Sequence, residues 1–362
     1  MLTSTWEDRI RPAVRVLEPY AWEMSSEAVA ERYGVPVEQV LRFDTNTSPF
    51  LPTNLTPTLA DLAARMPLNE YPDTSYGALV EAIADYTGFP ADQIVVGCGA
   101  DEVLDLVAKS FVEAGTRAVV SQPSYAMYPV LVATYGGELA AVPDGPGFVR
   151  DVAAIARAGR GAGIVFLCNP NNPTAHLIPL DEVERLVGQV ACPVVIDEAY
   201  FEFSGVTAAG LIVRHPNLIV VRTLSKAFSL AGLRVGYALT SREMADVLNR
   251  VRPPNSVGTL SVALGAAALR DLATMRARVA AILAEKERFT AGLRSAGVQV
   301  FPSATNFLLI RVAEPGRVVE ALLRAGIVVR DVSAKPGLNG CLRATVRLPE
   351  ENDRFLVALG KA

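Results

Sequence analysis

Histidine and cysteine are scarce in this 362-residue chain, and their scarcity disfavours several kinds of site. The two histidines, His176 and His215, are too few for most histidine-based metal centres, and they make a Ser-His-Asp triad hard to assemble. The four cysteines are Cys98, Cys168, Cys192 and Cys341. They show no paired spacing, so we expect reduced thiols in a cytoplasmic protein, with neither a disulfide framework nor a metal ion.

The sequence also lacks the features of secreted, membrane and nucleic-acid-binding proteins. Residues 1–8 have neither a basic start nor an apolar segment, as a secretory signal would. The longest uncharged apolar run, residues 257–269, is too short and too rich in Gly and Ser to span a bilayer. The net charge is −4 and no Lys/Arg-rich run occurs, so we expect no nucleic-acid partner and no membrane partner.

Lysine occurs at only five positions, and Lys226 among them has unusual surroundings. It follows the apolar run Leu218–Val221, which is typical of a buried strand. A partly desolvated amine loses its charge more readily and can then attack an aldehyde to form a Schiff base. A lone lysine is more often an exposed loop residue, so the neighbours of Lys226 must decide between the two interpretations.

Residues from about 50 to 250 alternate short apolar runs with longer amphipathic ones. The expected strands are 94–96, 118–120, 164–167, 194–196, 218–221 and 236–239. The expected helices between them are 101–113, 125–135, 151–157 and 181–190. This alternation predicts an α/β fold with a largely parallel sheet covered on both faces. Ligands of such sheets bind at the carboxyl ends of the strands.

The remainder of the chain predicts a second, smaller unit of α+β type. A helical pattern over 261–294, with a possible break near Asp271, precedes expected strands at 306–311 and 341–347. Further helices are expected at 26–33, 315–325 and 350–359. The length of 362 residues favours two or three domains. We predict an N-terminal arm with part of the small domain over 1–50, a large domain over 51–255 and a small domain over 256–362.

Two of the predicted strands are followed by residues suited to an anion and a ring. Gly97–Glu102 is a glycine turn that opens a helix, where the backbone N–H groups of Ala100 and Asp101 could hold a phosphate. An ordinary N-cap by Asp101 explains the same pattern equally well. After the next strand, Tyr125 lies in a proline-bounded turn, where it either stacks on a planar ring or simply packs.

The third and fourth strands end in polar residues. Asn172 lies in a rigid turn and serves either as a hydrogen-bond donor or as a turn residue. Asp197 ends the apolar run Val194–Ile196, where burying an acid is costly without a cationic partner. A pyridinium nitrogen would be such a partner, and Tyr200 could bind the phenolic oxygen of the same ring.

The residues that follow the fifth strand indicate the remaining groups of the ligand. Thr223, Ser225 and Arg234 stand around Lys226 and offer two hydroxyls and a guanidinium to a phosphate. Together the strand ends describe a planar pyridine that carries a phosphate, a phenolic oxygen and an aldehyde. Pyridoxal phosphate has these groups, and its chemistry needs a lysine and an acid at the ring nitrogen.

The same motifs carry a family resemblance. Thr223–Phe228 followed by Ala231–Arg234 resembles the fold type I pyridoxal phosphate enzymes, which share the aspartate-aminotransferase fold, and among them the histidinol-phosphate aminotransferases. The similarity extends from Leu17–Tyr20 to Pro349–Phe355. It implies a large, mostly parallel α/β/α domain, a smaller α+β domain and a homodimer.

The resemblance also implies roles for the matching residues. Lys226 would form the Schiff base and move a proton between the substrate and the cofactor, Asp197 would pair with the ring nitrogen, and Tyr200 would bind the phenolic oxygen with Asn172. These roles make Lys226, Asp197 and Tyr200 the predicted catalytic residues. The remaining predicted cofactor-binding residues are Gly99, Ala100, Asp101, Tyr125, Thr223, Ser225, Arg234 and, from the other subunit, Tyr71.

The implied substrates are an amino donor and a keto acid, in a ping-pong transfer between histidinol phosphate and 2-oxoglutarate. Arg343 would bind the α-carboxylate of glutamate, Arg330 and Tyr20 the substrate phosphate, and Asn46 lies on the substrate side. The chain departs from the family in this loop, where Asn-Glu-Asn-Pro is replaced by Asn46-Thr-Ser-Pro49 and the Gly that follows is replaced by Leu51.

A second departure replaces Pro-Thr-Gly with Pro173-Thr-Ala175. Three alternative functions stay open: an aromatic or other amino-acid aminotransferase, a threonine-phosphate decarboxylase, and the ligand-sensing domain of a transcription regulator. The last needs a DNA-binding module, for which the first fifty residues leave no room.

Overall fold

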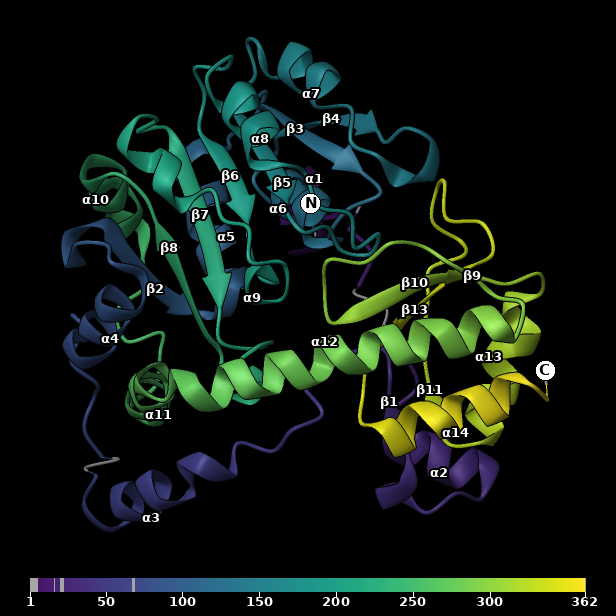
Figure 1. The fold of residues 1–362 in the computed structure, drawn as a ribbon. Coiled ribbons are helices and arrows are strands. Elements are labelled where there is room, and N and C mark those ends of the chain that lie inside the picture. The colour runs from purple at the N-terminus through teal and green to yellow at the C-terminus, as the bar shows by residue number, and fades with distance from the viewer. Residues whose placement is uncertain (1–5, 16, 20–22, 67–68, 362) are drawn as a thin grey trace, which may run out of the picture.

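The computed structural model describes residues 6–15, 17–19, 23–66 and 69–361, which form a seven-stranded sheet, a four-stranded sheet and a two-stranded pair, with one long helix running past the two larger sheets (Figure 1). The larger sheet has seven strands in the order β2-β8-β7-β6-β5-β3-β4. Their bounds are β2 Ile94–Cys98, β3 Arg117–Gln122, β4 Glu138–Pro143, β5 Ile164–Cys168, β6 Val194–Asp197, β7 Leu218–Thr223 and β8 Val235–Leu239. Only β8 runs antiparallel to its neighbours, so the predicted, largely parallel sheet is confirmed.

Helices pack on both faces of this sheet and bury them. Successive residues of a strand point to opposite faces, so neighbouring residues pack against different helices. Val95 packs with α5 (Gly99–Phe111), α6 (Met127–Thr134) and α10 (Arg242–Val251). Val96 packs in the other cluster, which the sheet forms with α4 (Gly77–Thr87), α7 (Val152–Gly159), α8 (Leu180–Val187) and α11 (Thr259–Arg270). Two apolar faces explain why the strands are continuously apolar in sequence.

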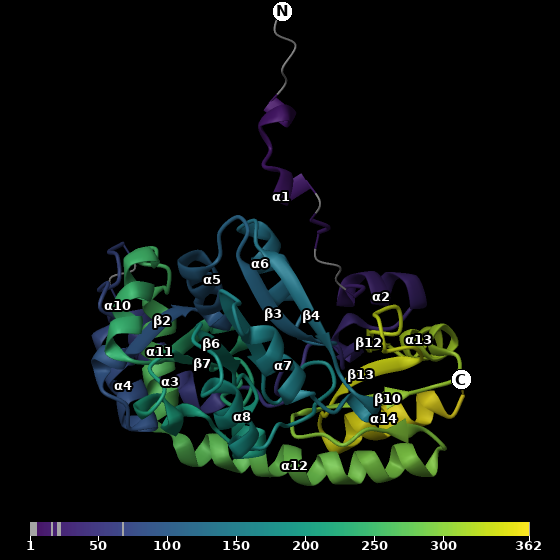
Figure 2. The ribbon, with the colours of Figure 1, turned by 90° about the horizontal axis from the view of Figure 1, so that it is seen from above.

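The smaller sheet has four antiparallel strands in the order β12-β13-β10-β9. Their bounds are β9 Gln299–Val300, β10 Phe307–Arg311, β12 Arg330–Asp331 and β13 Cys341–Thr345. Helices α2 (Ser26–Tyr33), α13 (Pro315–Arg324) and α14 (Pro349–Leu359) lie in the same part of the molecule. The long helix α12 (Leu272–Ser295) runs past both sheets, as the two ribbon views agree (Figures 1 and 2).

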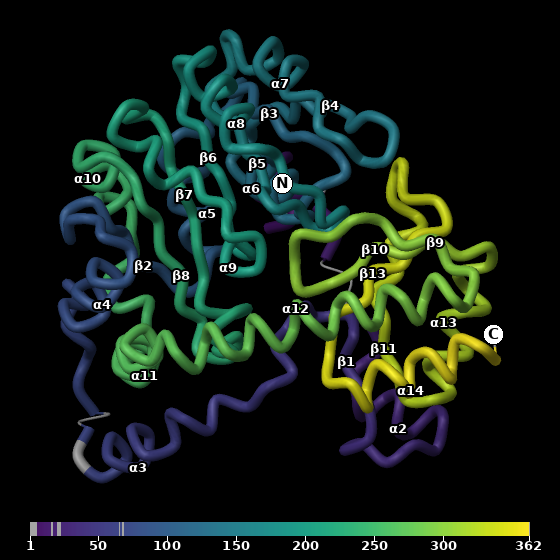
Figure 3. Tube along the Cα trace, in the orientation of Figure 1, coloured from purple at the N-terminus to yellow at the C-terminus, as the bar shows by residue number. Residues whose placement is uncertain are grey.

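The N-terminal part of the chain joins the C-terminal part through a short parallel pair. Strand β1 (Leu41–Arg42) pairs with β11 (Ile327–Val328), and the two run side by side in Figure 3. The Leu41 N–H donates to the Gly326 carbonyl at 2.8 Å, and the Phe43 N–H donates to Val328 at 2.8 Å. This pairing fixes the start of the loop that follows residue 43.

The sequence predicted most of these elements but missed several. The predicted break in the long helical pattern is confirmed, because the Asp271 side chain accepts a hydrogen bond from the Thr274 N–H and caps α12. The elements that the sequence did not predict are α1 (Pro12–Arg15), α3 (Thr56–Arg65), α4, α9 (Phe201–Ser204), α10, the edge strand β4 and the short strands β1, β9, β11 and β12. The domain boundaries after residues 50 and 255 stay a prediction.

Gly236 allows the amino end of α5 to approach the sheet. It lies opposite Gly97 in the β2–β8 pair, and an ideal Cβ at Gly236 would lie 2.3 Å from the Ala100 nitrogen. A contact this short with backbone atoms forces the helix to move away from β8.

We therefore expect Gly236→Ala to destabilise the protein by about 1–3 kcal/mol, the usual cost of overpacking a buried site. Gly210→Ala is the matched control, since no atom lies within 4 Å of its ideal Cβ. Urea denaturation of both variants measures the difference. Equal stability of the two would contradict the close approach of α5 to β8.

Candidate active site

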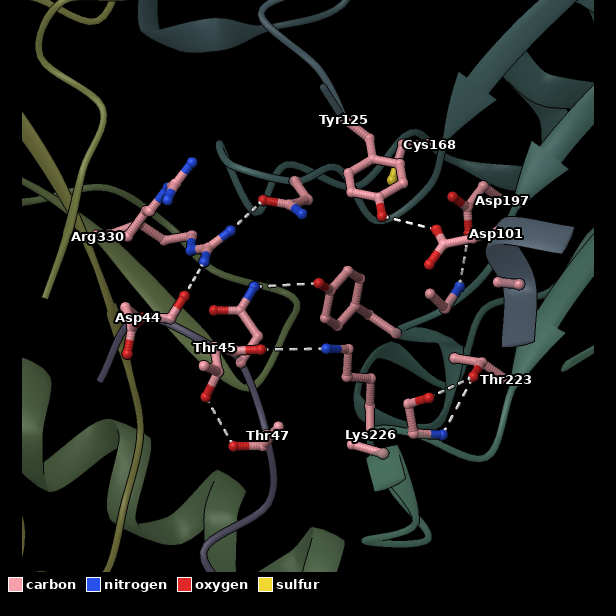
Figure 4. A pocket seen from close by; sticks show the side chains of 18 of the residues that line it. Asp44, Thr45, Thr47, Asp101, Tyr125, Cys168, Asp197, Thr223, Lys226 and Arg330 are labelled. Carbon is pink, nitrogen blue, oxygen red and sulfur yellow. Dashed lines mark hydrogen bonds between the residues drawn. The ribbon is translucent and has the colours of Figure 1, made fainter. Parts of the chain in front are cut away.

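A cavity of about 340 Å³ lies where the strand ends of the larger sheet face the smaller sheet (Figure 4). Its lining includes most of the residues that the sequence predicted. These are Asn46, Ala100, Asp101, Tyr125, Asn172, Asp197, Tyr200, Thr223, Ser225, Lys226, Arg234, Arg330 and Arg343. Strands β5, β6 and β7 end at this cavity, so one sheet edge supplies side chains from distant parts of the chain.

Lys226 lies at the centre of the lining, three residues past the end of β7. Its Nζ donates a hydrogen bond to the Thr45 carbonyl at 3.2 Å. Burial, followed by the positive charge of Arg343, lowers the pKa of Lys226 to about 8. An amine with this pKa is partly neutral near physiological pH, and the neutral form is the nucleophile.

Asp197 ends β6 with its side chain at the cavity and is only 3% exposed. Burial raises the pKa of its carboxyl to about 6, although two hydrogen bonds to the carboxylate oppose that shift. The Tyr128 hydroxyl donates to Oδ2 at 2.8 Å, and the Ala199 N–H donates to Oδ1 at 3.1 Å. The carboxyl is therefore largely ionised at neutral pH and offers a buried negative charge to a cationic ring nitrogen.

The end of the cavity nearest α5 is suited to an anion. Helix α5 begins at Gly99, and its first-turn residues Ala100 and Asp101 line the cavity, where the positive end of the helix dipole lies. The Thr223 and Ser225 hydroxyls are 2.8 Å apart on the same lining. Arg234 adds a guanidinium, and its Nη2 lies 3.1 Å from Asp101 Oδ2.

The alternative interpretation of Asp101 as an N-cap is wrong. The N-cap position is Cys98, and no side chain caps α5 there. Instead, the Asp101 carboxylate accepts hydrogen bonds from the Tyr125 hydroxyl at 2.8 Å and from Arg234. Asp101 thus orients the aromatic ring and the cation beside it.

Two arginines lie across the cavity from Thr223, where Figure 4 shows Arg330 at the opposite side of the view. Arg343 donates through Nη1 to Asn172 Oδ1 at 2.7 Å and through Nη2 to the Asp44 carbonyl. Arg330 Nη1 lies 3.3 Å from Glu23 Oε1. This end of the cavity suits a second anionic group, since arginine keeps its charge and binds carboxylate or phosphate in a bidentate manner.

Asn46 and Tyr200 connect the two ends of the cavity. Asn46 Nδ2 donates to the Tyr200 hydroxyl at 3.0 Å, and Asn46 itself is 1% exposed. Burial also raises the pKa of Tyr200, so its hydroxyl stays protonated and can donate to an acceptor in the cavity.

Two of the predicted site residues that the structure describes, Gly99 and Tyr71, do not line the cavity. Gly99 lies behind Arg234: an ideal Cβ at Gly99 would lie 2.5 Å from Arg234 Nη2, and its φ of +79° also favours glycine. Tyr71 is 86% exposed on the surface. Tyr20 lies outside the described residues. The roles of all the predicted residues stay predictions.

Sequence reasoning missed six residues of the lining: Asp44, Thr45, Thr47, Cys168, Ala199 and Ala231. Cys168 ends β5, so the strand-end argument that found Asp197 also applies to it. Asp44, Thr45 and Thr47 flank Asn46 in one polar loop. Among the described residues, no group of three or more His, Cys, Asp and Glu side chains could hold a metal ion.

Known proteins share this fold and much of this sequence. A histidinol-phosphate aminotransferase of Roseiflexus castenholzii is 37% identical over 97% of this chain and 97% of its own. The crystal structure of a histidinol-phosphate aminotransferase from Sinorhizobium meliloti in complex with pyridoxal-5'-phosphate has a TM-score of 0.89 and 27% identity, covering 100% of this chain and 98% of that one.

An aspartate aminotransferase structure from Thermus thermophilus has a TM-score of 0.78 at 23% identity, covering 97% of this chain and 99% of that one. This similarity confirms the predicted aspartate-aminotransferase-like fold. The family model for aminotransferase class I and II matches residues 38–359. The chain belongs to the aminotransferase class I and II family.

Proposed function

We propose that the protein is a pyridoxal phosphate-dependent aminotransferase that converts L-histidinol phosphate and 2-oxoglutarate to imidazole-acetol phosphate and L-glutamate. One observation carries the chemistry: an amine of lowered pKa, Lys226, shares a cavity with the buried carboxylate of Asp197. The choice of amino donor is supported by the 37% identity to a relative of that name over nearly the full length.

The residues of the cavity fit the cofactor at each of its polar groups. When bound, pyridoxal phosphate supplies an aldehyde that condenses with amines and a pyridine ring that withdraws electrons. The first turn of α5, with Thr223, Ser225 and Arg234, would hold the phosphate. Asp197 would hold the ring nitrogen, while Tyr200 and Asn172 would bind the phenolic oxygen, with Tyr125 stacked on the ring.

The residues of this chain would then divide the work of proton transfer. Lys226 Nζ, which is neutral at a pH above its pKa of about 8, would accept the proton from the substrate α-carbon and return it on the cofactor side. Asp197, which is anionic at a pH above its pKa of about 6, would keep the ring nitrogen protonated. Burial of both groups excludes water and strengthens these electrostatic effects.

The two arginines would serve the two half-reactions. Arg343 would bind the α-carboxylate of glutamate, and Arg330 the phosphate of histidinol phosphate, which has no α-carboxylate. Both side chains line the cavity, and the planar guanidinium of arginine binds carboxylate or phosphate in a bidentate manner. Tyr20 is proposed as a further phosphate ligand and Asn46 as a residue on the substrate side.

We propose further that the protein is a cytoplasmic homodimer in which Tyr71 reaches the cofactor phosphate of the other subunit. Tyr71 is 86% exposed in the single chain, so its side chain is accessible to a second subunit. All four cysteines are free thiols, which suits a reducing compartment. No helix among the described residues is long and apolar enough to cross a membrane.

The function is tested by a screen of single half-reactions. Purified protein loaded with pyridoxal phosphate is mixed with histidinol phosphate, glutamate, phenylalanine or phosphothreonine, and the loss of cofactor absorbance is followed. We expect histidinol phosphate and glutamate to react fastest. A fastest reaction with phenylalanine would favour an aromatic aminotransferase, and carbon dioxide release from phosphothreonine would favour a decarboxylase.

Lys226→Ala is the internal control for that screen. Losing the proton-transferring amine should slow the half-reactions by about 10²–10⁴-fold or more. Lys109→Ala removes an exposed lysine that does not line the cavity and whose amine donates to the Val251 carbonyl at 3.0 Å, so this variant should react normally. Normal turnover of Lys226→Ala would overturn the proposed chemistry.

The lowered pKa of Lys226 predicts a pH dependence for cofactor capture. Only the neutral amine attacks an aldehyde, so the rate at which apoprotein captures pyridoxal phosphate should rise with pH and level off above about 8. Stopped-flow absorbance from about pH 6 to about pH 10 spans both an ordinary and a lowered lysine pKa. A rate that still climbs through the ordinary lysine range would show that the amine is solvated.

Mixed dimers test the placement of Tyr71. Tyr71→Ala and Lys226→Ala subunits are co-expressed with different affinity tags, and the mixed dimer is isolated. If Tyr71 acts across the interface, one site of the mixed dimer is intact and the other carries both defects. Activity of the mixed dimer should then approach half that of the wild type. If Tyr71 acts within its own subunit, activity will not exceed half that of Tyr71→Ala.

A further inference from the structure

Glu198 and Arg222 form a buried ion pair that does not line the cavity. Arg222 Nε donates to Glu198 Oε2 at 3.0 Å, and the side chains are 5% and 1% exposed for Arg222 and Glu198. Glu198 follows Asp197, and Arg222 precedes Thr223. Each member of the pair is therefore the chain neighbour of a residue that does line the cavity.

The carboxylate of Glu198 collects two further donors. The Thr207 hydroxyl donates to Oε2 at 2.8 Å and the Ala208 N–H donates to Oε1 at 2.6 Å. Arg222 Nη2 in turn donates to the Thr207 Oγ1 at 2.6 Å. Three donors thus converge on two carboxylate oxygens, an arrangement that a neutral amide cannot satisfy because it has a single acceptor oxygen.

Arg222 also contacts the residue that follows Tyr200. Its Cζ lies 3.6 Å from the centroid of the Phe201 ring, a close cation–π contact. The guanidinium therefore holds the chain at Glu198 and again at Phe201, on either side of Tyr200. Tyr86 extends the contact, because its ring centroid lies 6.5 Å from Phe201 and 5.6 Å from Phe228, two residues past Lys226.

The energetics favour a role in geometry over a role in stability alone. A buried ion pair contributes little net stability relative to a well-packed apolar pair, because both charges lose their hydration. The directional hydrogen bonds of an ion pair, however, fix the relative position of the two chain segments that bear the paired side chains. Here they tie the end of β6, with Asp197 and Tyr200, to the end of β7, with Thr223 and Lys226.

We propose that Glu198 and Arg222 are positioning residues that hold the ring-binding and the lysine-bearing strand ends in register for the cofactor. The proposal rests on the proposed function. A positioning role differs from a purely structural role, in which the Glu198–Arg222 pair only anchors the loop at Thr207 and Ala208. A structural anchor changes the stability of the protein, whereas a positioning pair also changes its affinity for pyridoxal phosphate.

The test compares two buried ion pairs. Glu198→Gln breaks the proposed positioning pair. Asp144→Asn breaks a second ion pair, in which Arg150 Nη1 lies 2.6 Å from Asp144 Oδ1. The side chains of Asp144 and Arg150 are 2% and 1% exposed, and neither lines the cavity. Melting temperatures are measured on the apoproteins, and dissociation constants for pyridoxal phosphate are measured by absorbance titration.

We expect both variants to melt below the wild type, and the dissociation constant to rise about tenfold, or about 1.4 kcal/mol, in Glu198→Gln alone. Arg222→Lys keeps the charge but loses the paired Nε and Nη2 donors, and its dissociation constant should lie between those of Glu198→Gln and the wild type. If Glu198→Gln does not fold, Thr207→Val replaces it in the test. This variant removes the hydroxyl that bonds both Glu198 and Arg222, and its dissociation constant for pyridoxal phosphate should also rise.

Two outcomes would overturn the positioning role. One is a dissociation constant of Glu198→Gln that lies within about twofold of the dissociation constant of Asp144→Asn. A twofold ratio corresponds to about 0.4 kcal/mol of binding free energy. The other is a wild-type affinity in Thr207→Val when that variant must be used. Failure of the wild-type protein to bind pyridoxal phosphate at all would instead overturn the proposed function.

Discussion

The chemistry that we propose for this protein depends on the removal of one amine from water. Lys226 loses hydration inside the cavity and faces the positive charge of Arg343, and both effects favour its neutral form. The same burial acts on Asp197 in the opposite direction and raises its pKa, yet its hydrogen bonds keep the carboxyl largely ionised at neutral pH. A partly neutral amine and a buried, largely ionised carboxylate therefore line the same cavity.

The sheet topology makes that environment possible. Parallel strands β5, β6 and β7 all end at one edge, and each delivers polar residues there after a fully buried strand. The antiparallel strand β8 adds Gly236, which lets the first turn of α5 lie against the sheet. The first turn of α5 and the charged side chains at the strand ends thus line one cavity.

The other wall of the cavity comes from both ends of the chain. The loop after β1 brings Thr45 and Asn46 to Lys226 and Tyr200, and β13 brings Arg343 to Asn172. Pairing of β1 with β11 holds these segments together. The proposed substrate-binding residues therefore lie at a junction between two sheets. Asp197 ends β6 and Lys226 follows β7, and both strands belong to the larger sheet.

The sequence by itself determined the alternating strands and helices, the break at Asp271 and the residues at each strand end, because apolar periodicity and the cost of burying charge are local properties. It did not reveal β4, whose exposed edge gives a weak apolar pattern, nor the partners of Asp101. Only the tertiary structure decided that Asp101 holds Tyr125 and Arg234, that Thr45 faces Lys226 and that Glu198 pairs with Arg222. These contacts join residues far apart in the chain, and local pattern carries no information about such distances.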